Sequence, residues 1–258
     1  MDKQRYFEVK KGCRKMPPLR RSYIVRLTGR CAVLTGCVFL GILRPSAFEL
    51  LEGLNFFDRF SVLHILWGIW MTDMLWQLIP VNSRVPLGSQ KLFRKRFVPA
   101  DGKSNDPQLR EYIISTTKAA YRVFILWAVL IAVIGILFYI HVIDDRALFL
   151  ICVFFYVCDL ICVLIWCPFR LIMKNRCCTT CRIFNWDHLM MFSPLIFMGG
   201  FYGMSLVLTA FAVWMVWELC VMLFPERFWE VSNEALKCSN CTDKLCTQYC
   251  EKRRRKRG

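Results

Sequence analysis

Charged residues are scarce in this chain, and acidic residues are the scarcest. Asp, Glu, Lys and Arg make up 21% of the 258 residues, with 19 acidic against 35 basic side chains, while 56% of residues are hydrophobic. A soluble domain of this length carries more charge and distributes its apolar residues in short periodic runs. The composition therefore excludes an ordinary soluble enzyme, and its apolar content excludes a disordered chain.

Histidine is also scarce, and the common nucleotide-binding and hydrolase motifs do not occur. The three histidines lie on separate segments, which argues against a pair of histidine ligands for haem. No P-loop, dinucleotide fingerprint, nucleophile elbow or zincin motif is present. The sequence thus carries no signature of a common enzyme class.

Apolar residues instead lie in blocks of about 20, the length that a helix needs to cross a bilayer. The last block, 189–224, is too long for one span, and the turn-prone segment 199–203 interrupts it. We therefore predict an all-α polytopic membrane bundle of about six transmembrane helices with a small Cys-rich cytoplasmic tail. The expected spans are 23–43, 60–79, 123–143, 147–169, 186–201 and 204–224.

Basic residues predict the orientation of these spans. If six spans are drawn, and Arg26 and Arg30 are counted with the N-terminal end of the first span, all lysines and arginines except Arg44, Arg59 and Arg146 fall on one side. The positive side is cytoplasmic, so we expect both termini in the cytoplasm, in a bacterial cytoplasmic membrane. The chain then divides into three parts: a basic N-terminus at 1–22, a transmembrane domain at 23–224 with the cytoplasmic loop 80–122, and a Cys-rich basic tail at 225–258.

The long cytoplasmic loop should end in a helix. Asp106 followed by Pro107 is typical of a helix N-terminus, and we expect this helix to run straight into the third span. The net charge of +16 is explained by topology, so nucleic acid is not an expected partner. Membrane lipids are, and a membrane-protein partner or a second copy of the chain are further candidates.

Four cysteines in the tail have the spacing of a metal site. Cys238-x2-Cys241-x4-Cys246-x3-Cys250 supplies four thiolates within a short segment, which suits a tetrahedral zinc ion. A disulfide framework does not suit the reducing cytoplasm, but an iron–sulfur cluster would use the same ligands. The spacing resembles the zinc knuckle, with Cys in place of its His ligand.

A second group of thiols follows the fourth span. Cys177, Cys178 and Cys181 could form a redox pair, half of a metal site, or neither. A thioredoxin-like role needs a βαβ context that an all-α chain lacks. We therefore keep this group as the alternative metal or redox site.

Ionisable residues inside the spans are candidates for an intramembrane polar site, because charge is costly there. The candidates share overlapping depth near the cytoplasmic side, and Asp159 is near the midplane. Asp159 should therefore face the bundle interior, with a polar partner or a wet cavity. The predicted site comprises Arg26, Arg30, Asp73, Gln77, Asp159 and Glu218.

Three functions fit these features. The first is a membrane protein that binds or transports a small or amphiphilic ligand and carries a zinc module in its tail. The second is an intramembrane enzyme that acts on a lipid-linked substrate, with the acids as general acid and base. The third is a redox protein with iron–sulfur clusters. In the first two cases, a structural alternative is that Arg26 and Arg30 simply pair with Asp73 and Glu218.

Replacing Cys238, Cys241, Cys246 and Cys250 together with Ser should remove about one bound metal ion, or one cluster, per chain, because all four ligands are lost. Metal analysis and the visible absorption spectrum of the purified protein measure this. Colourless protein indicates zinc, and a broad visible band indicates iron–sulfur. An unchanged metal content would contradict the assignment and redirect it to Cys177, Cys178 and Cys181.

Overall fold

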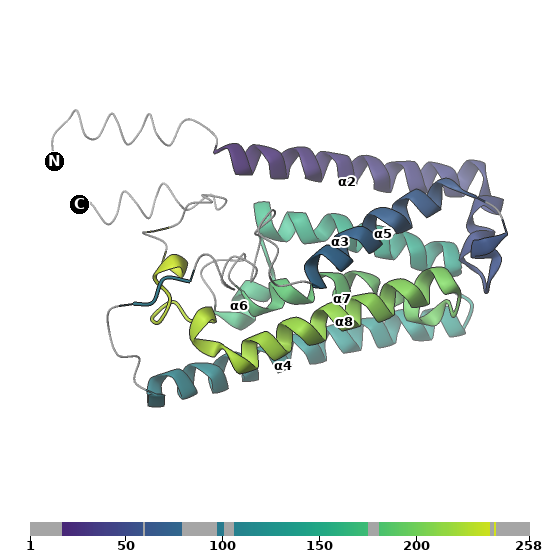
Figure 1. The fold of residues 1–258 in the computed structure, drawn as a ribbon. Coiled ribbons are helices and arrows are strands. Elements are labelled where there is room, and N and C mark those ends of the chain that lie inside the picture. The colour runs from purple at the N-terminus through teal and green to yellow at the C-terminus, as the bar shows by residue number, and fades with distance from the viewer. Residues whose placement is uncertain are drawn as a thin grey trace.

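Helices make up the regular structure of the described chain. The computed structural model describes residues 17–58, 60–78, 97–100, 106–174, 181–237 and 240. Within these ranges the elements are all helical, apart from one isolated antiparallel bridge between Pro99 and Asn233. The long helices run side by side in an elongated bundle (Figure 1). The predicted all-α class is confirmed.

Within the described ranges, four helices are long and apolar enough to cross a membrane. They are α2 (Pro18–Leu43), α4 (Asp106–Tyr139), α5 (Asp145–Leu164) and α8 (Phe201–Leu223). Soluble proteins rarely expose large contiguous apolar surfaces, so these helices are compatible with an integral membrane protein. In α4 the exposed apolar side chains include Phe124, Ile125, Leu126, Val129, Leu130, Val133 and Ile136.

The other two expected spans differ from the prediction. α3 (Val62–Leu78) has 17 residues, about 26 Å at 1.5 Å per residue, against a hydrocarbon core of about 30 Å. The segment expected as a span at 186–201 is not one α-helix. It is divided into η5 (Arg182–Trp186), α7 (Asp187–Phe192) and η6 (Ser193–Phe197). The described residues thus hold four candidate spans, and the count of about six is not confirmed.

The helix boundaries follow local chemistry. The predicted continuous helix from Asp106 into the third span is confirmed as α4. Asp144 caps α5 by accepting a 2.9 Å hydrogen bond from the Ala147 N–H. Although burial opposes its ionisation, this bond and Arg146 hold the pKa of Asp144 below its usual value. α5 ends at Leu164, before the expected residue 169 and four residues before Pro168, which has no N–H to donate to the Leu164 carbonyl and whose ring would clash with it in a continued helix.

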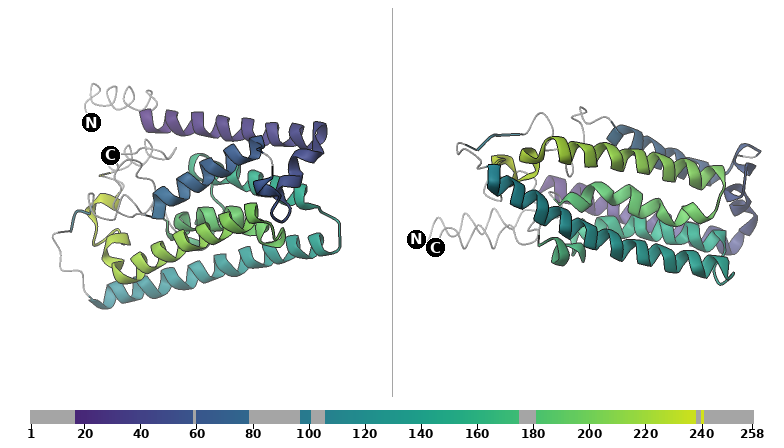
Figure 2. Two further views of the ribbon diagram at one scale, coloured as in Figure 1. Left: turned by 45° about the vertical axis from the view of Figure 1, so that its right-hand side comes forward. Right: turned by 90° about the horizontal axis from the view of Figure 1, so that it is seen from below.

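The core lies between α3, α5, α7 and α8, and α2 packs on its outside against α5. α3 packs on α8 instead, and the two views show α2 and α3 diverging from the end where residues 44–61 connect them (Figures 1 and 2). The N-terminal end of α2 and the C-terminal end of α8 lie at the opposite end. Large side chains at the centre of the core are Trp70, Phe149, Phe192, Tyr202 and Trp217.

The reversal between η6 and α8 needs two glycines. Gly199 has φ +65°, and a Cβ on Gly200 would lie 2.1 Å from the carbonyl oxygen of Leu51. The Phe201 N–H donates to the carbonyl oxygen of Gly53 at 2.9 Å, so this turn is seated directly on the loop that follows α2. Backbone contact this close excludes any side chain at position 200.

Gly200→Ala should lower the free energy of unfolding by about 1–3 kcal/mol, because its methyl group would force two backbone segments apart. Gly36→Ala in α2 is the matched control, since a Cβ there meets nothing within 4 Å. Thermal unfolding in detergent micelles measures both. Equal melting temperatures for the two variants would contradict the close approach at Gly200.

Candidate functional site

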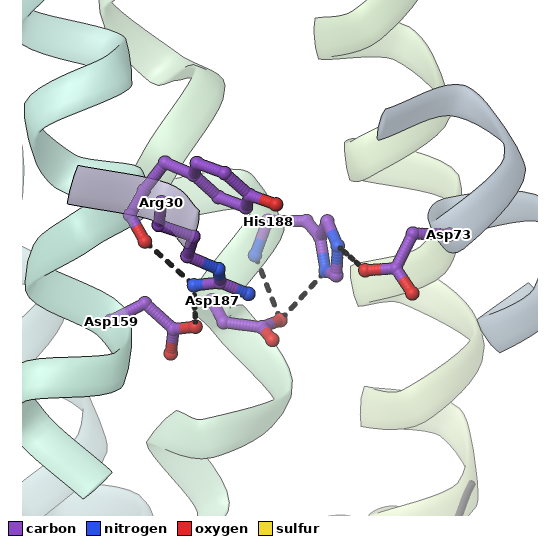
Figure 3. A network of polar contacts seen from close by, with 6 residues as sticks. Arg30, Asp73, Asp159, Asp187 and His188 are labelled. Atoms are coloured by element: carbon purple, nitrogen blue, oxygen red, sulfur yellow. Dashed lines mark hydrogen bonds and ion pairs between the residues drawn. The ribbon is translucent and has the colours of Figure 1, made fainter. Parts of the chain in front are cut away.

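Arg30 and Asp159 form an ion pair inside the bundle (Figure 3). Nη1 of Arg30 lies 2.6 Å from Oδ2 of Asp159 and also 2.6 Å from the carbonyl oxygen of Tyr156. The guanidinium lies 3.9 Å from the centre of the Tyr156 ring. The two charged side chains are only 17% and 20% exposed. Asp159 therefore has a polar partner on α2, as its depth in the sequence led us to expect.

His188 lies beside this pair, between two carboxylates (Figure 3). Its Nδ1 is 2.9 Å from Oδ1 of Asp187, and its Nε2 is 3.3 Å from Oδ2 of Asp73. Because an ionised carboxylate only accepts hydrogen bonds, both ring nitrogens donate when both bonds form, and the ring is then an imidazolium. His188 is buried, whereas the Asp73 side chain is 57% exposed. The imidazole thus connects a largely buried carboxylate to an accessible one.

A cavity of about 940 Å³ gathers these groups between α2 and α3. Its floor includes Tyr156 and Leu160 of α5, Asp187 of α7 and Trp217 of α8. Of the six residues predicted from the sequence to form an intramembrane polar site, five line this cavity: Arg26, Arg30, Asp73, Gln77 and Asp159.

Two buried donors in the cavity wall have no hydrogen-bond partner among the described residues. They are the Tyr23 hydroxyl and the Trp70 indole N–H, and these residues are only 2% and 1% exposed. Leaving a buried donor unpaired costs about 1–3 kcal/mol. Both residues line the cavity, so a ligand acceptor that reaches either donor would remove this cost.

The cavity is open along the side of the bundle. Ile65, Ile69 and Trp76 of α3 line it and are 54%, 53% and 41% exposed. On the facing wall, α2 contributes Arg26 and Gly29, which are also exposed. Apolar side chains of α3 thus form one edge of its opening, the lateral rim, Arg26 lies on the other edge, and Arg30, Asp159, Asp187 and His188 are more deeply buried.

Glu218 belongs to a different cluster. Its two carboxylate oxygens each accept a 3.1 Å bond from Nε of Arg182, a further bond links Oε2 to Nη2, and Oε1 accepts a 2.7 Å bond from the Trp186 indole. Nη1 of Arg182 donates to the Thr117 hydroxyl at 2.9 Å. This buried ion pair connects η5 to α8 and α4, and Glu218 does not line the 940 Å³ cavity.

Sequence reasoning missed three of these partners. Arg182 was assigned to a cytoplasmic loop, Asp187 was not included in the predicted site, and neither was His188. The sequence did indicate Asp187 and His188, because an acid and a histidine at the start of an apolar segment are expected at the same depth as Asp73. Both residues lie at the inner end of the span expected at 186–201, where Asp187 was interpreted as a helix cap and not as part of the polar site.

Cys181 is the one member of the two predicted cysteine sites that the described ranges include. It is buried and lines a second cavity of about 210 Å³. Cys158, Cys162 and Cys167 also line that cavity. Among the described residues no three His, Cys, Asp or Glu side chains are placed to hold a metal ion. The remaining predicted ligands lie outside the described residues: Cys177, Cys178, Cys238, Cys241, Cys246 and Cys250.

Comparison with known proteins gives no relative for this chain. It matches no protein-family model, no curated protein and no solved structure. Its function is therefore inferred from the chemistry of the cavity between α2 and α3.

Glu218→Gln should lower the free energy of unfolding by about 3–5 kcal/mol, because it leaves the buried charge of Arg182 uncompensated. Arg146→Gln is the control: its ion pair with Asp144 is about half exposed and contributes about 0.2–1 kcal/mol. Thermal or denaturant unfolding in detergent measures the difference. Similar losses in both variants would show that the Arg182–Glu218 pair is not a structural contact.

Proposed function

We propose that this protein is an integral membrane protein that binds an amphiphilic ligand in the cavity between α2 and α3. One observation supports this above the others: an apolar lateral rim leads to a charged cluster and to two unpaired buried donors. Ligand sites are mostly apolar cavities of about 300–1,000 Å³ with a few placed polar groups. An amphiphilic ligand would place its apolar part against the rim and its polar part against the charged cluster.

The lateral rim suits the apolar part of such a ligand. Ile65 and Ile69 are exposed on α3, and in a bilayer these side chains would meet acyl chains. A lipid could thus keep its tails in the membrane while its polar group reaches Arg30, Asp73 and His188. These charged side chains would offset the free-energy cost of burying the polar group, because a buried charge is tolerated when it is paired.

We also propose six membrane crossings, with both termini in the cytoplasm. The rod made of η5, α7 and η6 would be about 29 Å long if straight, since a 3₁₀ residue rises about 2.0 Å and an α residue about 1.5 Å. That length approaches the hydrocarbon core of about 30 Å. The charge distribution supports the orientation. The tail module of Cys238, Cys241, Cys246 and Cys250 is proposed as a structural zinc site on its spacing.

An intramembrane enzyme for a lipid-linked substrate is the second candidate. His188 between two carboxylates, one of them accessible from the cavity, is an arrangement that can accept and return a proton. Asp73 would be the group that meets the substrate. This candidate shares the cavity and its ligand class with the first and adds a chemical step.

Gly68→Phe tests the binding site, because a Cβ at Gly68 meets open space inside the cavity. The added ring should fill the cavity and lower the occupancy of co-purified or added phospholipid about tenfold, without lowering the melting temperature. Native mass spectrometry of the detergent-solubilised protein counts the bound lipid. Gly36→Phe is the matched control, since Gly36 also faces open space but does not line the cavity.

Equal lipid occupancy in the two variants would refute the proposed site. The same spectra separate the two candidate functions. A bound lipid that leaves with an altered mass, and that leaves unaltered from Asp73→Asn, would favour the enzyme.

A further inference from the structure

Charges of opposite sign face each other across the cavity. The α2 wall carries Arg26 and Arg30, and the α3 wall carries Asp73. None of the ion pairs within 4.0 Å between described residues joins Asp73 to either arginine. The simple α2–α3 pairing that the sequence offered as a structural alternative is therefore not formed.

The other charges of the cluster have partners of their own. Arg30 pairs with Asp159, and the imidazole of His188 is shared by Asp187 and Asp73. Arg26 makes no ion pair within the described chain, and its guanidinium lies 5.7 Å from the centre of the Tyr23 ring. The cavity thus has a cationic side with no counterion among the described residues and an acidic side whose carboxylate is accessible.

We propose that the ligand is a phospholipid with a zwitterionic, amine-bearing headgroup, a refinement that rests on the proposed function. Its phosphate lies at Arg26 and the Tyr23 hydroxyl, and its ammonium lies at Asp73. Guanidinium groups match phosphate oxygens in charge and geometry, and the Tyr23 hydroxyl is an unpaired donor. The ammonium provides the cation that Asp73 lacks on its accessible side.

Neighbouring groups fit the same headgroup. Trp76 lines the cavity three residues from Asp73, and an aromatic ring near an ammonium adds cation–π attraction. The unpaired indole N–H of Trp70 provides a donor for a phosphate or ester oxygen. Gly29 leaves open space on the α2 wall between Arg26 and Arg30, so that a bulky phosphate can approach the helix.

The lipid source is favoured over a soluble molecule with the same polar groups. The apolar rim of Ile65 and Ile69 is exposed on the side of the bundle, where acyl chains would be its natural neighbours. Soluble phosphoethanolamine would leave that rim uncovered. It serves as the probe that separates the two sources.

The test is competitive binding of phosphatidylethanolamine and phosphatidylglycerol with identical acyl chains, measured by native mass spectrometry. We expect the wild-type protein to prefer phosphatidylethanolamine about tenfold. The net charge of +16 attracts anionic lipids nonspecifically, so a preference for the zwitterion would oppose the overall electrostatics and report the site.

Variants assign the two halves of the headgroup. Asp73→Asn should reduce the preference to about one, and Asp73→Glu, which keeps the carboxylate, should retain it. Arg26→Gln should weaken both lipids about tenfold and leave their ratio unchanged. Arg21→Gln is the control, because Arg21 is exposed on α2 and does not line the cavity. Melting temperatures establish that each variant is folded.

Each contrary outcome overturns a defined part of the inference. Equal affinity for the two lipids, or an unchanged preference in folded Asp73→Asn, refutes the amine contact while lipid occupancy remains sensitive to Gly68→Phe. Displacement of the lipid by soluble phosphoethanolamine at equal concentration refutes the lipid source. Lipid binding that is insensitive to Gly68→Phe removes the proposed function itself.

Discussion

The ion pair between Arg30 and Asp159 determines where α2 lies, and the cavity depends on that position. α2 has its main helix contact with α5, and this pair is the charged contact in that interface. Both side chains are more than three-quarters buried, where an unpaired charge would be very costly. Since each charge requires the other, α2 is held against α5 at one register, with Arg26 and Tyr23 on the wall that faces α3.

α3 is held by a different partner, and the divergence of the two helices follows. The Trp67 indole donates to the Ser205 hydroxyl of α8 at 2.9 Å, and the Tyr202 hydroxyl donates to the carbonyl oxygen of Leu63 at 3.0 Å. The Trp70 ring is buried against the rings of Phe149 and Tyr156 in α5 and of Phe192 in α7. Because α2 packs mainly on α5 and α3 mainly on α8, the two helices diverge and the cavity lies between them.

The sequence predicted the all-α class and four long apolar helices, because helix formation depends largely on local information. A run of apolar residues gives the length of a helix, and Asp106-Pro107 gave the start of α4. Depth also grouped Arg30, Asp73 and Asp159 correctly. The depth argument wrongly grouped Glu218 with these residues. Depth gives the position of a residue along the bundle axis, whereas the direction in which its side chain points is determined by helix packing.

Segment 182–197 shows a second limit of sequence reasoning. Hydrophobic periodicity identifies α-helices by their 3.6-residue repeat, and this segment alternates between 3₁₀ and α geometry. Arg182 therefore looked like part of a loop, although it forms the buried pair with Glu218.

The way in which the charged residues beside the cavity pair with one another explains how a stable bundle can contain a polar cavity. Arg30, Asp159, Asp187 and His188 satisfy one another, so the interior holds these charges without external help. The buried groups left unsatisfied at the cavity, the Tyr23 hydroxyl and the Trp70 indole N–H, are neutral, and an unpaired neutral donor costs much less than an unpaired buried charge. Arg26, which makes no ion pair with a described residue, is exposed. The bundle therefore tolerates an empty cavity, and a ligand that accepts hydrogen bonds from both donors gains binding free energy from groups already held in place.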